Sequence, residues 1–258
     1  MLVRDALREA ERRLAAAGVD TPRVDAEWLV AHVLGTTRSA VYAHLDDEVE
    51  LDGLLTRREA REPLAYVLGE WGFRRLTLKT DTRALVPRPE TEIVVERALA
   101  VIRDVDEPRI LDIGVGSGAI ALSLKDERPD ARVVGVDVSE DALSLARENA
   151  QRLELDVDLR IGDERAAADG WDLVVSNPPY VDSLIGLQPE LAFEPHVALL
   201  GDGFHERIAA TADARALVLE VGDGQAQGVA DALRGHGWRE TAVTRDLAGV
   251  ERVVEGRR

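Results

Sequence analysis

The stretch Ile110-Leu111-Asp112-Ile113-Gly114-Val115-Gly116-Ser117-Gly118-Ala119-Ile120 joins an apolar run, a glycine-rich turn and the start of an apolar helix. A short apolar run bounded by glycines is typical of a buried strand. Glycines in the turn permit positive φ and let a ligand approach the main chain, and the N-terminus of the following helix favours negative charge. The stretch therefore predicts a strand–turn–helix unit with a ligand site at the turn.

Strand-like and helix-like segments alternate from residue 109 onward, which indicates an α/β fold with a mostly parallel sheet. We expect seven strands, at residues 109–113, 132–136, 157–161, 172–176, 215–221, 239–244 and 250–254. We expect helices at residues 118–127, 139–153, 204–213 and 224–236. Because no helix separates the last two strands, they should pair as an antiparallel edge hairpin through Asp246-Leu247-Ala248-Gly249.

Residues 1–65 are predicted to form a small helical domain, because apolar residues recur there at helical spacing. The first helix carries Leu7, Ala10 and Leu14 and ends at Gly18. The second begins at Thr21-Pro22 and ends at Gly35, with an expected buried stripe of Val24, Trp28, Leu29, Ala31 and Val33. Ser39 is expected to cap a third helix, and Asp52 a fourth that ends near Glu62. Such a bundle either binds a macromolecular partner, covers the active site or serves only for packing.

A β-hairpin linker is expected at residues 66–86, where Trp71, Phe73, Leu76 and Leu78 suggest a strand and Leu85-Val86 a partner for it. The third segment, residues 87–258, is expected to form the main domain. It begins with Pro87-Arg88-Pro89-Glu90-Thr91-Glu92, which enters a helix.

Composition narrows the class of protein. The chain of 258 residues has no cysteine and a net charge of -17, and residues 81–258 hold 20 basic against 35 acidic side chains. This acidic balance disfavours direct binding to nucleic acid. The sequence shows neither a membrane span nor a signal peptide, so we expect a cytoplasmic protein, and we expect a monomer. No metal site is expected, because no metal-ligand spacing connects the histidines His32, His44, His196, His205 and His236.

Polar residues follow the first four predicted strands of the sheet. Asp137 ends the second strand, where a carboxylate can accept hydrogen bonds from ribose hydroxyls. Asp163 and Glu164 follow the third strand, where a carboxylate either contacts an adenine amino group or caps the turn. The glycine loop and Asp137 alone also fit a dinucleotide-dependent dehydrogenase.

The fourth strand ends in Asn177-Pro178-Pro179-Tyr180. Two consecutive prolines stiffen the turn and remove N–H donors, so the main-chain carbonyls and the Asn177 side-chain oxygen remain as acceptors. Tyr180 adds a flat apolar face with a hydroxyl. This combination suits a planar group that carries an NH2.

The order of these motifs resembles the class I S-adenosylmethionine-dependent methyltransferases that act on planar NH2 groups. The resemblance implies a Rossmann-like fold and S-adenosyl-L-methionine as the cofactor. It implies that the cofactor is held by Asp112, Gly114, Val115, Gly116, Ser117, Gly118, Asp137, Asp163, Glu164 and Asn177. It also implies that Asn177, Pro178, Pro179 and Tyr180 form the catalytic motif, with Tyr180 packed on the substrate.

Three further segments resemble signatures of the peptide chain release factor glutamine methyltransferases, the HemK/PrmC family. They are Glu62–Gly69, Leu85–Glu92 and Phe193-Glu194-Pro195. The resemblance implies methylation of the glutamine of the GGQ motif in release factors, a step in the modification of the translation termination machinery. The alternative readings are a nucleic-acid adenine N6-methyltransferase, which would share the Asn-Pro-Pro-Tyr chemistry, and a cofactor-binding module without catalysis.

Overall fold

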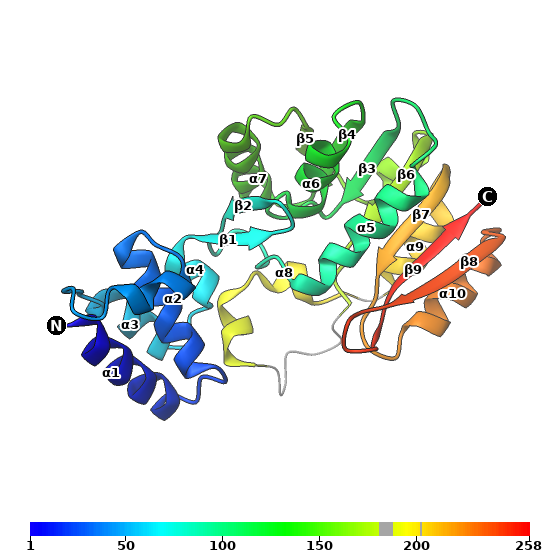
Figure 1. The fold of residues 1–258 in the computed structure, drawn as a ribbon. Coiled ribbons are helices and arrows are strands. Elements are labelled where there is room, and N and C mark those ends of the chain that lie inside the picture. Colours follow the sequence, from blue (N-terminus) through cyan, green and yellow to red (C-terminus); the bar gives the residue numbers. More distant parts are fainter. Residues whose placement is uncertain (181–187, 202) are drawn as a thin grey trace. The chain divides into compact units, whose positions relative to one another are not determined.

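The chain forms two compact units, as seen in a computed structural model that describes residues 1–180, 188–201 and 203–258 (Figure 1). The helical unit consists of Met1–Glu70 and Leu187–Phe193, and the sheet unit consists of Trp71–Gly186 and Glu194–Arg258. The sequence had suggested a boundary near residue 65 and a separate linker to residue 86. The sequence did not indicate that the distant segment Leu187–Phe193 belongs to the helical unit.

The helical unit is built from short helices around a small apolar core. In the described residues these are α1 (Val3–Ala16), α2 (Pro22–Leu34), η1 (Arg38–Ala43), α3 (Asp52–Glu59), α4 (Leu64–Leu68) and η4 (Pro189–Phe193). The expected stripe of α1 is confirmed, since Leu7, Ala10 and Leu14 are buried. The chain leaves α1 through Gly18, whose φ of 74° is the conformation that glycine adopts most easily.

Three details of the helical unit differ from the prediction. Trp28 and Val33 are exposed, because α2 turns Ala26, Leu29 and Val30 toward the core instead. The third helix is a 3₁₀ helix whose cap is not Ser39. Thr37 takes that place, with its side chain accepting a hydrogen bond from the Ala40 amide. The fourth helix ends at Glu59.

Buried ion pairs bind the second segment of the helical unit to its helices. Arg58 donates from Nε to Asp25 at 2.7 Å and from Nη2 to Glu190 at 2.9 Å. Arg61 donates to both carboxylate oxygens of Glu190, each at 2.7 Å. The Arg58 and Asp25 side chains are only 7% and 6% exposed. Guanidinium groups match carboxylates in planar geometry, so this cluster fixes Glu190 in position.

The sheet unit contains the expected seven-stranded sheet, in the order β5-β4-β3-β6-β7-β9-β8. The strands are β3 (Arg109–Ile113), β4 (Arg132–Asp137), β5 (Asp158–Ile161), β6 (Trp171–Ser176), β7 (Ala214–Glu220), β8 (Glu240–Arg245) and β9 (Glu251–Arg257). The strands β3 to β7 pair in parallel, whereas β9 is antiparallel to both β7 and β8. The predicted edge hairpin is therefore confirmed. Its inner strand is β9, where Val253 and Val254 are buried.

Helices cover both faces of this sheet (Figure 1). The helices described in the sheet unit are η2 (Pro89–Thr91), α5 (Glu92–Val101), α6 (Ala119–Glu127), α7 (Glu140–Leu153), η3 (Glu164–Ala168), α8 (His196–Leu199), α9 (Phe204–Thr211) and α10 (Ala226–Gly235). Alternate strand residues face opposite sides. Ile110 packs with the cluster that includes α5, α6 and α7, and Leu111 with the cluster that includes α9 and α10. The central parallel strands β3, β6 and β7 are thus largely buried on both faces, whereas the edge strand β5 is mostly exposed.

The hairpin before the sheet consists of β1 (Glu70–Phe73) and β2 (Leu76–Lys79), which form a two-stranded sheet of their own. The prediction that Leu85-Val86 would pair with this segment was wrong, because residues 85–86 form no strand. Asn149 of α7 instead contacts the outgoing strand, accepting from the Lys79 amide at 2.7 Å and donating to the Lys79 carbonyl at 3.1 Å. In the part of the chain that the structure describes, no helix is long and apolar enough to cross a membrane.

Candidate active site

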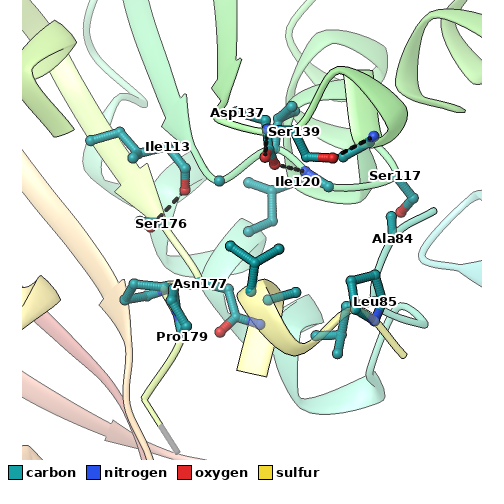
Figure 2. Close-up of a pocket in the computed structure, with 18 of the residues that line it drawn as sticks. Ala84, Leu85, Ile113, Ser117, Ile120, Asp137, Ser139, Ser176, Asn177 and Pro179 are labelled. Atoms are coloured by element: carbon teal, nitrogen blue, oxygen red, sulfur yellow. Dashed lines mark hydrogen bonds between the residues drawn. The ribbon is translucent and has the colours of Figure 1, made fainter. Parts of the chain in front are cut away.

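A cavity lies at the carboxyl ends of β3, β4, β5 and β6 (Figure 2). Because these strands are parallel, the four loops that follow them meet at one edge of the sheet, where ligands of α/β proteins bind. The predicted site residues that line the cavity are Gly114, Val115, Gly116, Ser117, Asp137, Asp163, Glu164, Asn177, Pro178 and Pro179. The order of the motifs along the chain had predicted that these residues would lie at one edge of the sheet.

The glycine loop forms one wall of the cavity. Gly114 has a φ of 73°, and a Cβ at that position would meet no atom within 4 Å, so its main chain is left bare beside open space. Gly118 does not line the cavity; a Cβ there would lie 2.8 Å from Leu122 Cδ1. Gly114 thus leaves room for a ligand, and Gly118 lets α6 begin directly after the turn.

Asp137 links the glycine loop to the loop after β4 (Figure 2). Its Oδ2 accepts from the Gly116 amide at 3.0 Å, and its Oδ1 accepts from the Ser139 amide at 2.9 Å. An ionised carboxylate has about four lone-pair positions, so both oxygens keep the capacity to accept from a ligand hydroxyl. The geometry thus combines a structural role with an acceptor at the cavity wall.

Asp163 and Glu164 line the cavity as charged acceptors. Asp163 caps η3 by accepting from the Arg165 amide at 3.0 Å, and the Arg165 guanidinium lowers the pKa of the Asp163 carboxyl. Glu164 accepts from Arg207 Nε at 2.8 Å. The structure therefore gives Asp163 the turn-capping position that the sequence offered as one of two possibilities, and it also places the residue at the cavity.

Asn177 directly follows β6, the end of which is held by Ser176. The Ser176 hydroxyl donates to the Ile113 carbonyl at 2.7 Å (Figure 2). The Asn177 side chain donates from Nδ2 to Thr91 Oγ1 at 3.2 Å. None of the described residues donates to Asn177 Oδ1, and the next two residues are prolines. The turn therefore presents acceptors, as its sequence predicted.

Tyr180 is placed differently from the sequence interpretation. It does not line the cavity. Its hydroxyl donates to Glu220 Oε1 at 3.2 Å, and its carbonyl accepts from Gln225 Nε2 at 3.1 Å. Burial is the largest cause that raises the pKa of the Tyr180 hydroxyl. In this arrangement Tyr180 anchors the end of the Asn-Pro-Pro-Tyr turn.

Asp112 also lies outside the cavity wall. It is fully buried in β3, and its Oδ2 accepts from the Ala121 amide of α6 at 3.1 Å. Among the described residues, none forms a hydrogen bond with Asp112 Oδ1. Burial raises the pKa of this carboxyl to about 7. Its contacts tie α6 to the sheet beneath the glycine loop, and the sequence could not separate this role from direct contact with a ligand.

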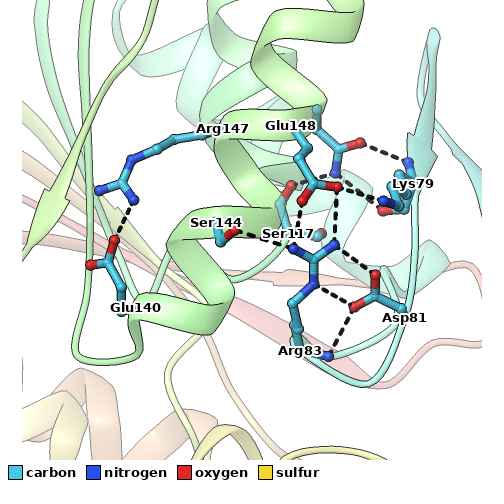
Figure 3. A network of polar contacts seen from close by, with 9 residues as sticks. Lys79, Asp81, Arg83, Ser117, Glu140, Ser144, Arg147 and Glu148 are labelled. Atoms are coloured by element: carbon cyan, nitrogen blue, oxygen red, sulfur yellow. Dashed lines mark hydrogen bonds and ion pairs between the residues drawn. The ribbon is translucent and has the colours of Figure 1, made fainter.

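Residues 81–88, here called the strap, line the cavity from Arg83 onward, which the sequence did not predict. Figure 3 shows the Arg83 guanidinium between the carboxylates of Asp81 and Glu148, with bonds of 2.7 Å to each. At the other end of the strap, the buried Glu194 accepts from the Val86 amide at 3.2 Å and pairs with Arg88. The sequence held one indication of the strap, which is that residues 85–92 and Glu194 belong to family signatures. The structure shows that these two signatures contact each other.

Two family models match the chain, the PrmC N-terminal domain at residues 5–69 and the methyltransferase small domain at residues 92–190. A release factor glutamine methyltransferase of Deinococcus radiodurans is 43% identical over 100% of this chain and 99% of its own length. Proteins of the same name from Rhodospirillum rubrum and Cereibacter sphaeroides are 42% and 39% identical, over 95% and 100% of this chain and 82% and 99% of their own lengths.

Solved structures support the fold. The hMettl16 catalytic domain in complex with the MAT2A 3'UTR hairpin 1 superposes with a TM-score of 0.58 at 14% identity, over 81% of this chain and 85% of that one. The Thermus thermophilus 16S rRNA methyltransferase RsmC, solved with AdoMet and guanosine, gives a TM-score of 0.52 at 17% identity, over 73% and 49%. These likenesses confirm a Rossmann-like methyltransferase fold, and the full-length similarity decides the family. The chain belongs to the release factor glutamine methyltransferases.

Proposed function

We propose that this protein transfers a methyl group from S-adenosylmethionine to the side-chain amide nitrogen of the GGQ glutamine in peptide chain release factors. The observation that carries the proposal is the geometry of Asn177, whose NH2 group is held by Thr91 while its oxygen has no donor among the described residues. Release factors act in the cytoplasm, and we propose that the enzyme works there as a monomer. We further propose that the helical unit binds the protein substrate.

The residues of the cavity suit the proposed cofactor. The bare main chain at Gly114 and the open space beside it leave room for a ligand against the glycine loop. Asp137 would accept from the ribose hydroxyls, and Asp163 and Glu164 provide acceptors for the adenine side. Apolar Val138 and Ile120 also line the cavity and would contact the base. When bound, the cofactor supplies an activated methyl group on a positively charged sulfur.

The Asn177 turn would orient a poor nucleophile. The lone pair of an amide nitrogen is delocalised into its carbonyl, so the two amide hydrogens must be held for the lone pair to face the methyl group. Asn177 Oδ1 and the Pro178 carbonyl would each accept one of these hydrogens. Orientation and fixed dipoles would then supply most of the rate increase. As the nitrogen gains the methyl group, it would release one of its two amide protons to water.

Mass spectrometry of a release factor incubated with the protein and cofactor tests this function. We expect a single added methyl group on the GGQ glutamine, and none when that glutamine is replaced by alanine. Parallel incubations with DNA and RNA should remain unmethylated, since the acidic surface repels both. Methylated adenine in those samples, with an unmodified release factor, would replace the proposal by the nucleic-acid alternative.

Replacing Asp137 with alanine should weaken cofactor binding more than it slows turnover at saturating cofactor. The carboxylate is proposed to bind the ribose, far from the reacting nitrogen, so we expect cofactor Kd to rise about tenfold to a hundredfold. Calorimetric titration gives the Kd. The loss of the bonds to the Gly116 and Ser139 amides is a second effect, so Asp137→Asn, which keeps one acceptor, serves as the control. Unchanged affinity in Asp137→Ala would remove this residue from the ribose.

A further inference from the structure

A chain of hydrogen bonds leads from the Asn177 amide into the interior of the sheet unit. Asn177 Nδ2 donates to Thr91 Oγ1 at 3.2 Å, and Thr91 Oγ1 donates to Glu220 Oε2 at 2.6 Å. Glu220 ends β7 and Thr91 ends η2, so the three residues come from three separate parts of the chain. Glu220 and Thr91 are only 2% and 4% exposed. Such burial limits the partners that each polar atom can find.

We propose that Thr91 and Glu220 are positioning residues that determine which end of the Asn177 amide faces the substrate. The inference rests on the proposed function, because it explains how the acceptor used in amide methylation is held in place. The proposed function does not by itself require Glu220. The inference adds that the orientation of the Asn177 amide depends on this buried carboxylate, which is two hydrogen bonds away.

The number of hydrogens available to Thr91 and Glu220 fixes the orientation of the Asn177 amide. An ionised carboxylate can only accept hydrogen bonds, and a hydroxyl has one hydrogen to donate. Once the Thr91 hydroxyl donates to Glu220, only its lone pairs remain for Asn177. An amide oxygen facing those lone pairs would be repelled, so the NH2 end of Asn177 must point to Thr91. The oxygen is then left for the substrate.

The second oxygen of Glu220 is also occupied. Glu220 Oε1 accepts from the Tyr180 hydroxyl at 3.2 Å. Glu220 is therefore connected to both ends of the Asn-Pro-Pro-Tyr turn. It contacts Tyr180 directly and is linked to Asn177 by the Thr91 hydroxyl. Burying a carboxylate costs free energy, and an apolar residue of similar size would avoid that cost. A role in orienting the turn accounts for the charge at this position.

The ionisation of Glu220 provides an independent consequence. Burial raises the pKa of Glu220 to about 7. The groups that face it are Tyr180, Arg252 of β9 and Glu90 of η2, while His205 of α9 contacts its main-chain carbonyl at 2.7 Å. Burial lowers the pKa of His205, which favours the neutral imidazole there. A protonated Glu220 can donate to Thr91, which then donates to Asn177 and favours the flipped amide.

The orienting chain requires an ionised Glu220. Below the raised pKa the carboxyl is neutral and the orienting chain is lost, so kcat should fall as the pH decreases through about 7. In Glu220→Gln the side chain does not titrate, so this acidic limb should disappear. A Glu220→Gln enzyme with the wild-type pH profile would contradict the proposal.

A matched pair of variants at Thr91 separates orientation from packing. Thr91→Val keeps the shape and loses the hydroxyl, whereas Thr91→Ser keeps the hydroxyl and loses a methyl group. We expect Thr91→Val to lower kcat for release factor methylation about tenfold to a hundredfold, with cofactor Kd within about twofold, and Thr91→Ser to retain kcat within about threefold. Equal losses in both variants, or wild-type kcat in Thr91→Val, would overturn the proposal.

A measurement without methyl transfer keeps this inference separate from the proposed function. NMR of asparagine side-chain NH2 groups, with the Asn177 signal assigned by its loss in Asn177→Ala, reports the bond to Thr91 directly. We expect slow hydrogen exchange at this NH2 group in the wild type and in Thr91→Ser, and faster exchange in Thr91→Val. If the Asn177 signal is the same in all three proteins, the chain of hydrogen bonds does not orient the amide, whatever the substrate is.

Discussion

Replacing Asn177 with alanine is expected to lower kcat for release factor methylation by about 10²–10³-fold, because the amide nitrogen loses one of the two acceptors proposed to orient it. Fixed dipoles that act mainly in the transition state contribute to kcat more than to binding. The Kd of the cofactor should therefore change much less than kcat. Single-turnover kinetics with saturating cofactor measures the chemical step.

The variant Asn177→Asp is the sharper control. It has nearly the same shape and keeps an oxygen on the cavity side, but it replaces the NH2 group by a second oxygen. That oxygen would face the lone pairs of Thr91 Oγ1, now 3.2 Å from Nδ2. We expect Asn177→Asp to be impaired as well, since an acceptor without the correct orientation is insufficient. Wild-type kcat in Asn177→Ala would show that Asn177 does not orient the substrate amide.

Replacing Arg58 with alanine is expected to destabilise the helical unit by about 3 kcal/mol, because the buried Asp25 carboxylate loses its guanidinium partner. Glu190 would keep its bonds to Arg61, and Asp25 would keep the Thr21 hydroxyl at 2.8 Å. We therefore expect a loss of stability at the lower end of the range that is typical when one partner of a buried ion pair is removed. Native-state hydrogen exchange of amides in α2 and α3 measures it within this unit.

Arg12→Ala is the matched control for this change. Arg12 also donates to a carboxylate through two nitrogens, at 3.0 and 2.6 Å to Glu9, but its side chain is 69% exposed. Exposed ion pairs contribute little, so exchange in the helical unit should hardly change. If the two variants had equal effects, burial would not be what makes the Arg58 cluster important.

The sequence predicted the parts of the molecule that depend on local pattern and chain order. The apolar run before Gly114, the carboxylate at Asp137 and the turn at Asn177 each follow a strand, and parallel strands bring such positions to one edge. The antiparallel hairpin followed from the absence of a helix between two strands. No long-range contact had to be known for any of these predictions.

The missed features depend on contacts between distant residues. Helical spacing did not reveal which side of α2 meets the core, so Trp28 was wrongly expected to be buried. Leu85-Val86 has strand-like residues, but the Val86 amide bonds to the Glu194 side chain, 108 positions away. Glu220 gave no signal, because a glutamate at the end of a strand is unremarkable until the hydroxyls of Thr91 and Tyr180 are seen to donate to it.

The attachment of Leu187–Phe193 to the helical unit has a consequence for how the molecule can be divided. The chain passes from the helical unit to the sheet unit after Glu70, returns near residue 187 and leaves again after Phe193. A single cut after Glu70 therefore cannot separate the two units cleanly, since the segment with Glu190 belongs to the helical unit but would stay with the sheet unit, and Glu190 would lose Arg58 and Arg61. The two units are separately packed, but they are not modular pieces that a gene fusion or a protease could exchange at one site.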